Sequence, residues 1–254
     1  MKIIIDTDVK SIDVERFNER KVMSLYSKEG FELISELWMK VGMNERYPYT
    51  FTWMGRPIIQ FPMDMFRVQE VLYTIKPDVI LETGIAHGGS LIYYASLFKA
   101  MNKGRVIGVD IEIRPHNREA IESHELSPYI TLIEGDSVDP DIIKAVKQRI
   151  RPEEVTLVIL DSNHTKEHVL QELEAYQDLV SSRSYIIVQD GIIKDLYDAP
   201  MGKAEWKFDN PYEAAREFIK KHSDFEMVTP AWLFNESELT KDVTQWPGAW
   251  IRKS

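Results

Sequence analysis

Apolar and polar residues follow a block pattern from Pro77 onward that is typical of alternating strands and helices. Short apolar runs, which predict strands, cover residues 79–82, 105–109, 130–133, 155–160 and 184–189. Apolar positions that recur every three or four residues predict helices over residues 89–101, 117–123, 140–150 and 165–180. Strands rich in Val, Ile and Leu, separated by helices, indicate a parallel sheet buried on both faces. We therefore predict an α/β fold with a mostly parallel twisted sheet and helices on both of its faces.

The C-terminal part of the chain extends this pattern. Residues 211–222 predict a helix, with Pro211 near its start. Residues 225–229 and 248–252 predict two more strands, joined by residues 230–247, in which we expect no helix of standard length. A terminal antiparallel pair of strands on the parallel sheet fits this order.

The N-terminal part lacks the regular alternation. Residues 2–5 predict a small edge strand, and residues 13–40 predict a helix with a broken apolar stripe. Residues 44–64 are irregular and hold several aromatic side chains and three prolines. Asp64 is expected to cap a helix over residues 64–75.

The change of pattern at Pro77 predicts a division of the chain. Residues 77–254 would form the ligand-binding domain, and residues 1–76 would form a cap or lid, or a segment for oligomerisation. For residues 44–64, a lid, a packing arm and a subunit contact remain open alternatives.

The composition of the chain limits the kinds of partner and metal site that we expect. The formal net charge of −10 argues against a general nucleic-acid binder, because such binding neutralises phosphates with basic side chains. No apolar run reaches the roughly 18 residues of a membrane span, so no membrane partner is expected. The chain has no cysteine, which excludes disulfides and thiolate metal sites and fits a cytoplasmic protein.

A strand, a glycine-rich turn and a helix follow one another over residues 79–90. Gly84, Gly88 and Gly89 would let a ligand approach the backbone, and the helix that starts near Ser90 would offer unpaired N–H groups. This arrangement is how an α/β sheet begins a nucleotide site.

Five successive strands are each followed by an acidic residue, and parallel strands bring these ends to one edge of the sheet. The five residues are Glu82, Asp110, Asp136, Asp161 and Asp190. Asp110 stands where a carboxylate accepts both hydroxyls of an adenosine ribose, and Asp136 stands where an adenine amino group would lie. The chain has neither the regular dinucleotide fingerprint nor a phosphate-binding loop, so the ligand need not carry a diphosphate. An adenosine that carries an amino-acid sulfonium fits at least as well.

Asp161, Gln189 and Asp190 form a second set at neighbouring strand ends. Two carboxylates and an amide supply only oxygen ligands, which suit a hard divalent cation such as magnesium. The alternative is structural: Asp161 would cap the helix from residue 165, and Asp190 would cap a turn at Gly191.

Several motifs resemble the family of cephalosporin hydroxylases and rhamnosyl O-methyltransferases. They are Pro77-Asp78 with the run to Ser90, Trp53-Met-Gly55, Pro62-x-Asp64, Gln69-Glu70, Gly108-Val-Asp110, Glu134-Gly-Asp136-Ser137, Asp161-Ser-Asn-His164 and Gln189-Asp190-Gly191. The resemblance covers roughly residues 50–200. It implies the Rossmann-like fold of class I S-adenosylmethionine-dependent methyltransferases with a magnesium site, akin to catechol O-methyltransferases.

The resemblance also implies roles for single residues. S-adenosylmethionine would be bound by Glu82, Gly84, Gly88, Ser90, Asp110 and Asp136, with His87 and Ser137 beside them. Magnesium would be held by Asp161 and Asp190. The remaining metal position is usually an acid in this family, and here it is Gln189, whose neutral amide lowers the charge of the site by one.

The expected reaction is methyl transfer to a hydroxyl oxygen. Magnesium would stabilise the deprotonated hydroxyl, and His164, three residues after Asp161, is the candidate general base. His164, Glu167 and His168 also match the inverted zinc-protease pattern, so a zinc hydrolase is an alternative. A non-catalytic protein that binds adenosine or a nucleotide sugar is a second alternative.

Residues 191–210 follow the last metal-site strand directly and are expected to form the acceptor-binding loop. Tyr197, Trp206 and Phe208 would stack on a sugar ring or aromatic acceptor, or simply pack the loop. The family favours a small-molecule acceptor, either a sugar hydroxyl or a specialised metabolite. The loop could also reach a neighbouring subunit, and we expect a homo-oligomer.

Overall fold

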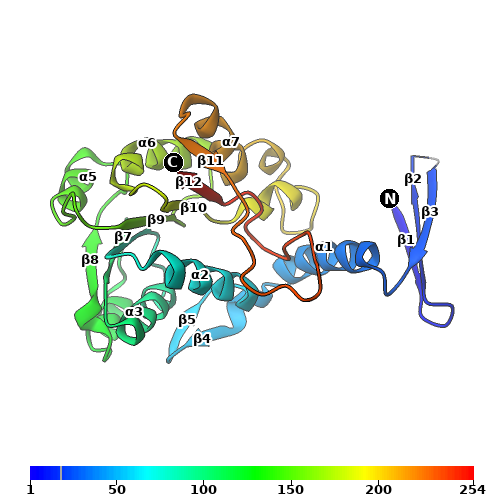
Figure 1. The fold of residues 1–254 in the computed structure, drawn as a ribbon, viewed down its shortest axis with the longest axis horizontal. Coiled ribbons are helices and arrows are strands. Elements are labelled where there is room, and N and C mark those ends of the chain that lie inside the picture. The colour runs from blue at the N-terminus through cyan, green and yellow to red at the C-terminus, as the bar shows by residue number, and fades with distance from the viewer. Residues whose placement is uncertain (18) are drawn as a thin grey trace.

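The computed structural model describes residues 1–17 and 19–254; residue 18, within the predicted helix over 13–40, lies outside the described residues. A seven-stranded sheet forms the centre of the molecule, in the order β11-β12-β10-β9-β6-β7-β8 (Figure 1). Its strands are β6 (Val79–Thr83), β7 (Arg105–Asp110), β8 (Ile130–Glu134), β9 (Thr156–Leu160), β10 (Tyr185–Val188), β11 (Phe225–Met227) and β12 (Trp250–Lys253). β12 runs antiparallel to both β10 and β11, while β6 to β10 are parallel neighbours. The predicted mostly parallel sheet with a terminal antiparallel strand is confirmed.

Helices cover both faces of this sheet, as Figure 1 shows. They are α2 (Pro62–Ile75), α3 (Gly89–Met101), α4 (Pro115–Glu122), α5 (Pro140–Lys147), α6 (Lys166–Tyr176) and α7 (Pro211–Lys221). The chain also forms short 3₁₀ helices, which are η1 (Tyr47–Thr50), η2 (Ser127–Tyr129), η3 (Gln177–Leu179), η4 (Gly191–Asp195) and η5 (Ala204–Lys207). Successive strand side chains point to opposite faces, so Ile80 joins the core under α2 and α3 while Leu81 joins the core under α6 and α7. Both faces are therefore apolar, as the continuous Val, Ile and Leu runs predict.

The N-terminal prediction of one helix over residues 13–40 is wrong in its first half. Three strands, β1 (Lys2–Asp6), β2 (Ser11–Arg16) and β3 (Glu19–Ser24), pair as an antiparallel meander, and α1 covers only Lys28–Asn44. Ile12 and Val14 alternate with acidic residues, which is the period of a strand, and Ile12 pairs with both Ile5 and Met23. In Figure 1 this small sheet stands apart from the central body, which it meets through α1.

The irregular segment 44–64 contains a hairpin of β4 (Phe51–Trp53) and β5 (Arg56–Ile58) that packs on α3. The Trp53 indole meets the Tyr93 ring edge-on at 5.0 Å and donates a hydrogen bond of 3.1 Å to the Ser96 hydroxyl. The hairpin thereby places residues 57–60 beside the C-terminal ends of the strands.

Asp64 does not cap a helix as predicted, because α2 begins earlier, at Pro62, with Phe61 in the capping position. The Asp64 carboxylate instead accepts hydrogen bonds from the Thr244 hydroxyl and from the Gln245 backbone N–H at 3.0 Å. The segment 230–247 contains no helix, as predicted, and it lies against α2 at this point. Among residues 1–17 and 19–254, no helix is long and apolar enough to cross a membrane.

Candidate active site

The candidate site lies at the C-terminal end of β6, at the point where the order of the strands in the sheet reverses. From β6 the chain passes first to β7 on one side and later to β9 on the other, and ligands bind at such a switch point in open α/β sheets. A cavity of about 230 Å³ opens there. It is lined by Tyr49, Pro57, Ile58, Ile59, Gln60, Gly84, Ile85, Ala86, His87, Gly89, Ser90, Asp110, Asp161, Ser162, His164 and Asp190. One cavity thus brings together the glycine loop, the predicted ribose acid and the two predicted metal-binding acids.

The glycine loop is shaped by close backbone approaches. Gly84 has a φ of +89°, and a Cβ on it would lie 2.0 Å from the carbonyl oxygen of Asp161. A Cβ on Gly89 would lie 2.1 Å from the carbonyl oxygen of Pro57. Ala86 adopts a φ of +47°, a conformation that costs a non-glycine residue about 1 kcal/mol or more. The loop is therefore held in one conformation by its neighbours on both sides.

Two residues outside the loop fix its carbonyl groups, and the sequence reading missed both. The Arg56 guanidinium donates to the carbonyl oxygen of His87, with its Nε at 3.0 Å, and to the Asn117 side-chain oxygen at 2.9 Å. Asn117 in turn donates from Nδ2 to the carbonyl oxygen of Ala86 at 2.9 Å. Because Arg56 and Asn117 donate hydrogen bonds to these two carbonyl groups, they help to fix the conformation of the loop beside the cavity. Neither residue belongs to a motif that sequence reasoning could have used.

Asp110 contacts the loop directly. Its Oδ2 accepts hydrogen bonds from the backbone N–H groups of Ile85 at 2.7 Å and Ala86 at 3.1 Å, and its Oδ1 accepts from Glu112 N–H at 3.2 Å. A carboxylate has about four acceptor positions, so Asp110 retains capacity for further donors at the cavity wall. The residue predicted to bind ribose thus also shapes the loop that would hold the rest of the ligand.

Glu82 lies beneath the loop and is fully buried. One of its oxygens accepts a hydrogen bond of 2.7 Å from the Ser90 hydroxyl, and Oε1 has no partner of ordinary geometry among the described residues. Burial is the main reason that the pKa of Glu82 is raised to about 8. Glu82 is not among the residues that line the cavity.

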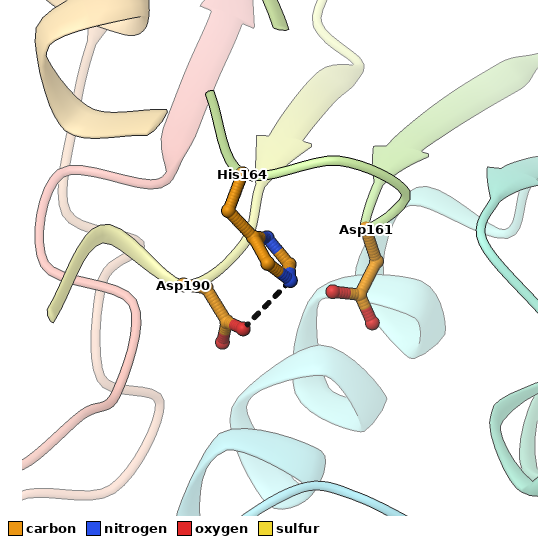
Figure 2. Close-up of side chains that lie close together, drawn as sticks. All are labelled: Asp161, His164 and Asp190. Carbon is orange, nitrogen blue, oxygen red and sulfur yellow. Dashed lines mark ion pairs between the residues drawn. The ribbon is translucent and has the colours of Figure 1, made fainter. Parts of the chain in front are cut away.

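Three side chains converge at the other end of the cavity: Asp161, His164 and Asp190 (Figure 2). One potential ligand atom of each lies within 4.8 Å of the other two, and His164 Nε2 is 3.5 Å from Asp190 Oδ2. Burial raises the pKa of Asp161 well above its ordinary range, and the negative charge of Asp190 adds to the rise. Burial likewise raises the pKa of Asp190. Two carboxyl groups this close are costly to ionise unless a cation compensates them, so their donor set fits a divalent metal ion.

Asp190 reaches this position through an uncommon backbone conformation. It directly follows Gln189 at the end of β10 and has a φ of +56°, in the left-handed region that few non-glycine residues adopt. Strained residues of this kind persist only where their surroundings hold them, and they gather at functional sites.

Gln189, predicted as a metal ligand, lies outside the wall of the cavity. It is 1% exposed, and its Oε1 accepts a hydrogen bond of 3.4 Å from Gln60 Nε2. Its own Nε2 has no hydrogen-bond partner among the described residues. In this arrangement the Gln189 side chain contacts Gln60 from the cap segment.

Asp136 and Ser137 do not line the cavity either. Asp136 Oδ1 accepts from Val138 N–H at 3.1 Å. Ser137 is 5% exposed, and its hydroxyl lies 2.6 Å from Glu172 Oε1 and 3.1 Å from His168 Nε2. Both residues stand at the end of β8, beyond the glycine loop and Asp110.

The geometry argues against the zinc hydrolase alternative. His164 precedes α6, which begins at Lys166, so the pattern does not lie on one helix face. His168 turns toward Ser137 and Glu172, whereas His164 turns toward Asp190. The group of potential metal-binding side chains in the described residues contains neither Glu167 nor His168.

Comparison with known proteins agrees with this site. Residues 45–254 match the family model "Rhamnosyl O-methyltransferase/CmcI". A rhamnosyl O-methyltransferase of Mycobacterium bovis is 30% identical over 146 residues, which cover 56% of this chain and 57% of that protein. The Mycobacterium leprae counterpart is 28% identical over 181 residues, covering 70% of this chain and 74% of that protein. The chain therefore spans little more than half of the first of these relatives.

Solved structures share the fold. A CmcI structure described with Mg and SAM superposes with a TM-score of 0.52 at 20% identity, covering 81% of this chain and 77% of that one. A putative caffeoyl-CoA O-methyltransferase from Staphylococcus aureus gives a TM-score of 0.52 at 12% identity, covering 78% and 91%. The family match covers the whole central sheet and every residue of the cavity. The chain belongs to the rhamnosyl O-methyltransferase/CmcI family.

Proposed function

We propose that this protein is an S-adenosylmethionine-dependent O-methyltransferase assisted by a divalent cation, magnesium in the first instance. The observation that carries the proposal is the shared cavity, which the glycine loop and Asp110 line together with Asp161, His164 and Asp190. A methyl donor and a hydroxyl acceptor must meet within about 3–3.5 Å for in-line transfer, and one cavity with both sets of groups permits this.

The donor would lie along the glycine loop. Gly84, Gly88 and Ser90 would face it, with His87 beside them, and Asp110 would accept from the ribose hydroxyls. Glu82, whose Oε1 lacks a partner among the described residues, would accept a hydrogen bond from the amino-acid end. Asp136 and Ser137 remain our proposed contacts for the adenine, at the rim of the site.

Asp161 and Asp190 would hold the divalent cation. When bound, such a cation lowers the pKa of a nearby hydroxyl and so makes the oxygen a better nucleophile. Gln189 remains our proposed third ligand, although its amide would have to leave its contact with Gln60 to fill that place.

His164 would accept the proton of the acceptor hydroxyl at Nε2. Asp190 Oδ2, 3.5 Å away, would stabilise the imidazolium that results. A neutral imidazole can accept a proton, which is the task of a general base.

The acceptor would be a small molecule, a sugar hydroxyl or a specialised metabolite, in keeping with the names of the relatives. Tyr49 lines the cavity, and residues 191–210 directly follow Asp190 in the chain. Asp190, Asp161 and His164 form what we call the metal end of the cavity. Phe208 is 70% exposed and Tyr197 37% exposed, so both are available for stacking, whereas Trp206 packs against a buried cluster. With a net charge of −10, the chain is not proposed to bind nucleic acid or a membrane, and a cytoplasmic location fits its lack of cysteine.

The N-terminal segment would have two roles. Tyr49 and residues 57–60 line the cavity, so this part of the segment would act as a lid over the donor. The meander over residues 2–24 stands apart from the body and exposes Ile4, Ile5 and Val22, so it would form a contact within a homo-oligomer. Light scattering on the chain with and without residues 2–24 tests that role.

Calorimetry with S-adenosylmethionine tests the proposal most directly. We expect binding in the micromolar range, and no binding at high micromolar donor would overturn it. Transfer of a labelled methyl group to a panel of sugars and phenols, with and without magnesium, tests the reaction. Donor binding without transfer to any acceptor in the presence of magnesium would favour the non-catalytic alternative.

A further inference from the structure

The connection between β11 and β12, residues 228–249, runs back across α1 and α2 before it returns to the sheet (Figure 1). Lys241 pairs with Glu36 of α1, and Asp242 accepts from Arg67 of α2 at 3.3 Å. The Arg67 guanidinium also lies over the ring of Trp232, 5.6 Å from its centroid, and the Trp232 indole donates to Asp242 within the connection at 2.6 Å. These ties hold the connection, here named the C-terminal strap, against the N-terminal helices.

The strap places Gln245 in contact with Asp190, at the metal end of the cavity. Gln245 is 2% exposed, and each of its four polar groups has a partner. Its backbone N–H donates to Asp64 Oδ2 at 3.0 Å, and its carbonyl accepts from Ile192 N–H at 3.1 Å. Its side-chain Oε1 accepts from Phe61 N–H at 3.3 Å, and its Nε2 donates to Asp190 Oδ1 at 3.4 Å.

Hydrogen bonds made by the neighbouring residue Thr244 further restrict the backbone at Gln245. The Thr244 hydroxyl donates to Asp64 Oδ1 and accepts from Trp246 N–H at 2.9 Å. Asp64 is itself 3% exposed in the first turn of α2. The Thr244 side chain and the Gln245 backbone are thus held against α2, which restricts where the Gln245 side chain can lie.

This amide contacts the Asp190 carboxylate, whose other oxygen lies near His164. Asp190 presents Oδ2 to His164, while Oδ1 has Gln245 as its hydrogen-bond donor. A carboxylate bonded through one oxygen can no longer turn about its Cβ–Cγ bond without losing that bond. Groups that orient metal-binding side chains in this way typically change metal affinity by 10- to 100-fold.

We infer that Gln245 is a positioning residue, which orients the Asp190 carboxylate for the divalent cation. This inference rests on the metal-assisted function proposed above. Gln245 is part of the strap and contacts Phe61 and Asp64 at the start of α2 as well as Asp190 in the site, so it links these three parts of the protein.

Calorimetric titration of the full chain with Mn²⁺ and with Mg²⁺, without donor or acceptor, tests the inference. Gln245→Met keeps the length of the side chain and removes its donor, and we expect roughly tenfold weaker cation binding. Gln245→Asn keeps an amide that is one methylene shorter and should weaken binding in the same direction. Asp242→Asn loosens the outer tie of the strap but keeps Gln245, and it should leave cation affinity within about twofold of the unmodified chain.

S-adenosylmethionine affinity, measured on the same variants, reports whether the glycine loop is intact, and we expect it to stay within about twofold. Cation binding by both Gln245 variants as tight as that of the unmodified chain would overturn the inference alone. Equal weakening by Asp242→Asn would also overturn it, because the effect would then belong to the strap as a whole. An unmodified chain that binds donor but neither cation would overturn the metal-assisted function, and the inference with it.

Discussion

Gly84 and Asp161 meet across the two central strands so closely that a Cβ on Gly84 would lie 2.0 Å from the Asp161 carbonyl oxygen. The contact joins the first residue of the glycine loop to the first residue of the metal end. Asp161 N–H also donates to the carbonyl oxygen of Thr83 at 2.9 Å. The two halves of the proposed site therefore share a backbone contact and cannot shift independently.

Gly84→Ala should destabilise the protein by more than its backbone conformation alone explains. A left-handed φ costs alanine about 1 kcal/mol or more, and the clash with Asp161 adds to this. Gly55→Ala is the matched control, because Gly55 has a φ of +85° and a Cβ added to it would meet no heavy atom of the described residues within 4 Å. Chemical denaturation should show a loss at least about 1 kcal/mol larger for Gly84→Ala. Equal losses would mean that the loop can move away from Asp161.

Asp110→Ala should weaken S-adenosylmethionine binding by at least about tenfold. The change removes the expected ribose acceptor and also frees the N–H groups of Ile85 and Ala86. Asp110→Asn keeps one acceptor oxygen and should lose less. Calorimetry on both variants makes the comparison, and unchanged affinity in Asp110→Ala would place the ribose elsewhere.

His164→Gln should lower kcat by roughly 10²- to 10⁴-fold while donor affinity stays near its original value. The glutamine keeps a polar side chain beside Asp190 but cannot accept the proton at neutral pH. His222→Gln is the control, since His222 pairs with Glu174 at 2.9 Å, outside the lining of the cavity. Single-turnover methyl transfer measures the chemical step. A rate within threefold of the original would remove His164 from the role of base.

Glu82→Gln should change how stability depends on pH. The pKa of Glu82 is raised from 4.5 to about 8, so between these values the folded protein binds the proton more tightly than the unfolded chain. Its contribution to the free energy of unfolding therefore falls as pH rises from about 4.5 to about 8. Glutamine does not titrate, so the variant should gain more than about 1 kcal/mol relative to the original between pH 5 and pH 8.5. Denaturation curves that stay parallel across this range would contradict the raised pKa.

Cation binding should release protons and weaken as the solution becomes more acidic. Burial raises the pKa of both Asp161 and Asp190, so protons compete with the cation for these carboxylates. Titrations in two buffers of different ionisation enthalpy at one pH should give different observed heats. Identical heats would mean that both carboxyl groups are already ionised before the cation arrives. Asp161→Asn should abolish measurable binding.

The sheet could be predicted from the sequence because its signal is local. The central strands β6, β9 and β10 are almost continuous apolar runs, and the helices repeat their apolar residues within a few positions. Helix α3 begins at Gly89 and ends at Met101, as predicted. The helix predicted over residues 13–40 is wrong in its first half, because the residues around Ile12 and Val14 alternate strictly between apolar and polar. The period of two was the stronger signal there.

The acids at the strand ends could also be predicted, since parallel strands place Asp110, Asp161 and Asp190 at one edge. The residues that hold them could not. Arg56 contacts the His87 carbonyl from 31 positions away, and Gln245 contacts Asp64 from 181 positions away. A single arginine or glutamine carries no periodicity or motif. Such contacts follow from how the elements pack, which no local pattern encodes.

Gln245 also has a consequence for the order of folding. Its partners Phe61 and Asp64 precede it by 184 and 181 residues, and its partner Asp190 by 55. Closing loops of this length costs chain entropy, which shorter-range contacts within the sheet must already have offset. We therefore expect the local strand–helix units to form early, and the Gln245 amide to reach Asp190 only after the strap has docked. A cation that binds there would therefore select molecules that have finished folding, and it would not act as a nucleus for the chain.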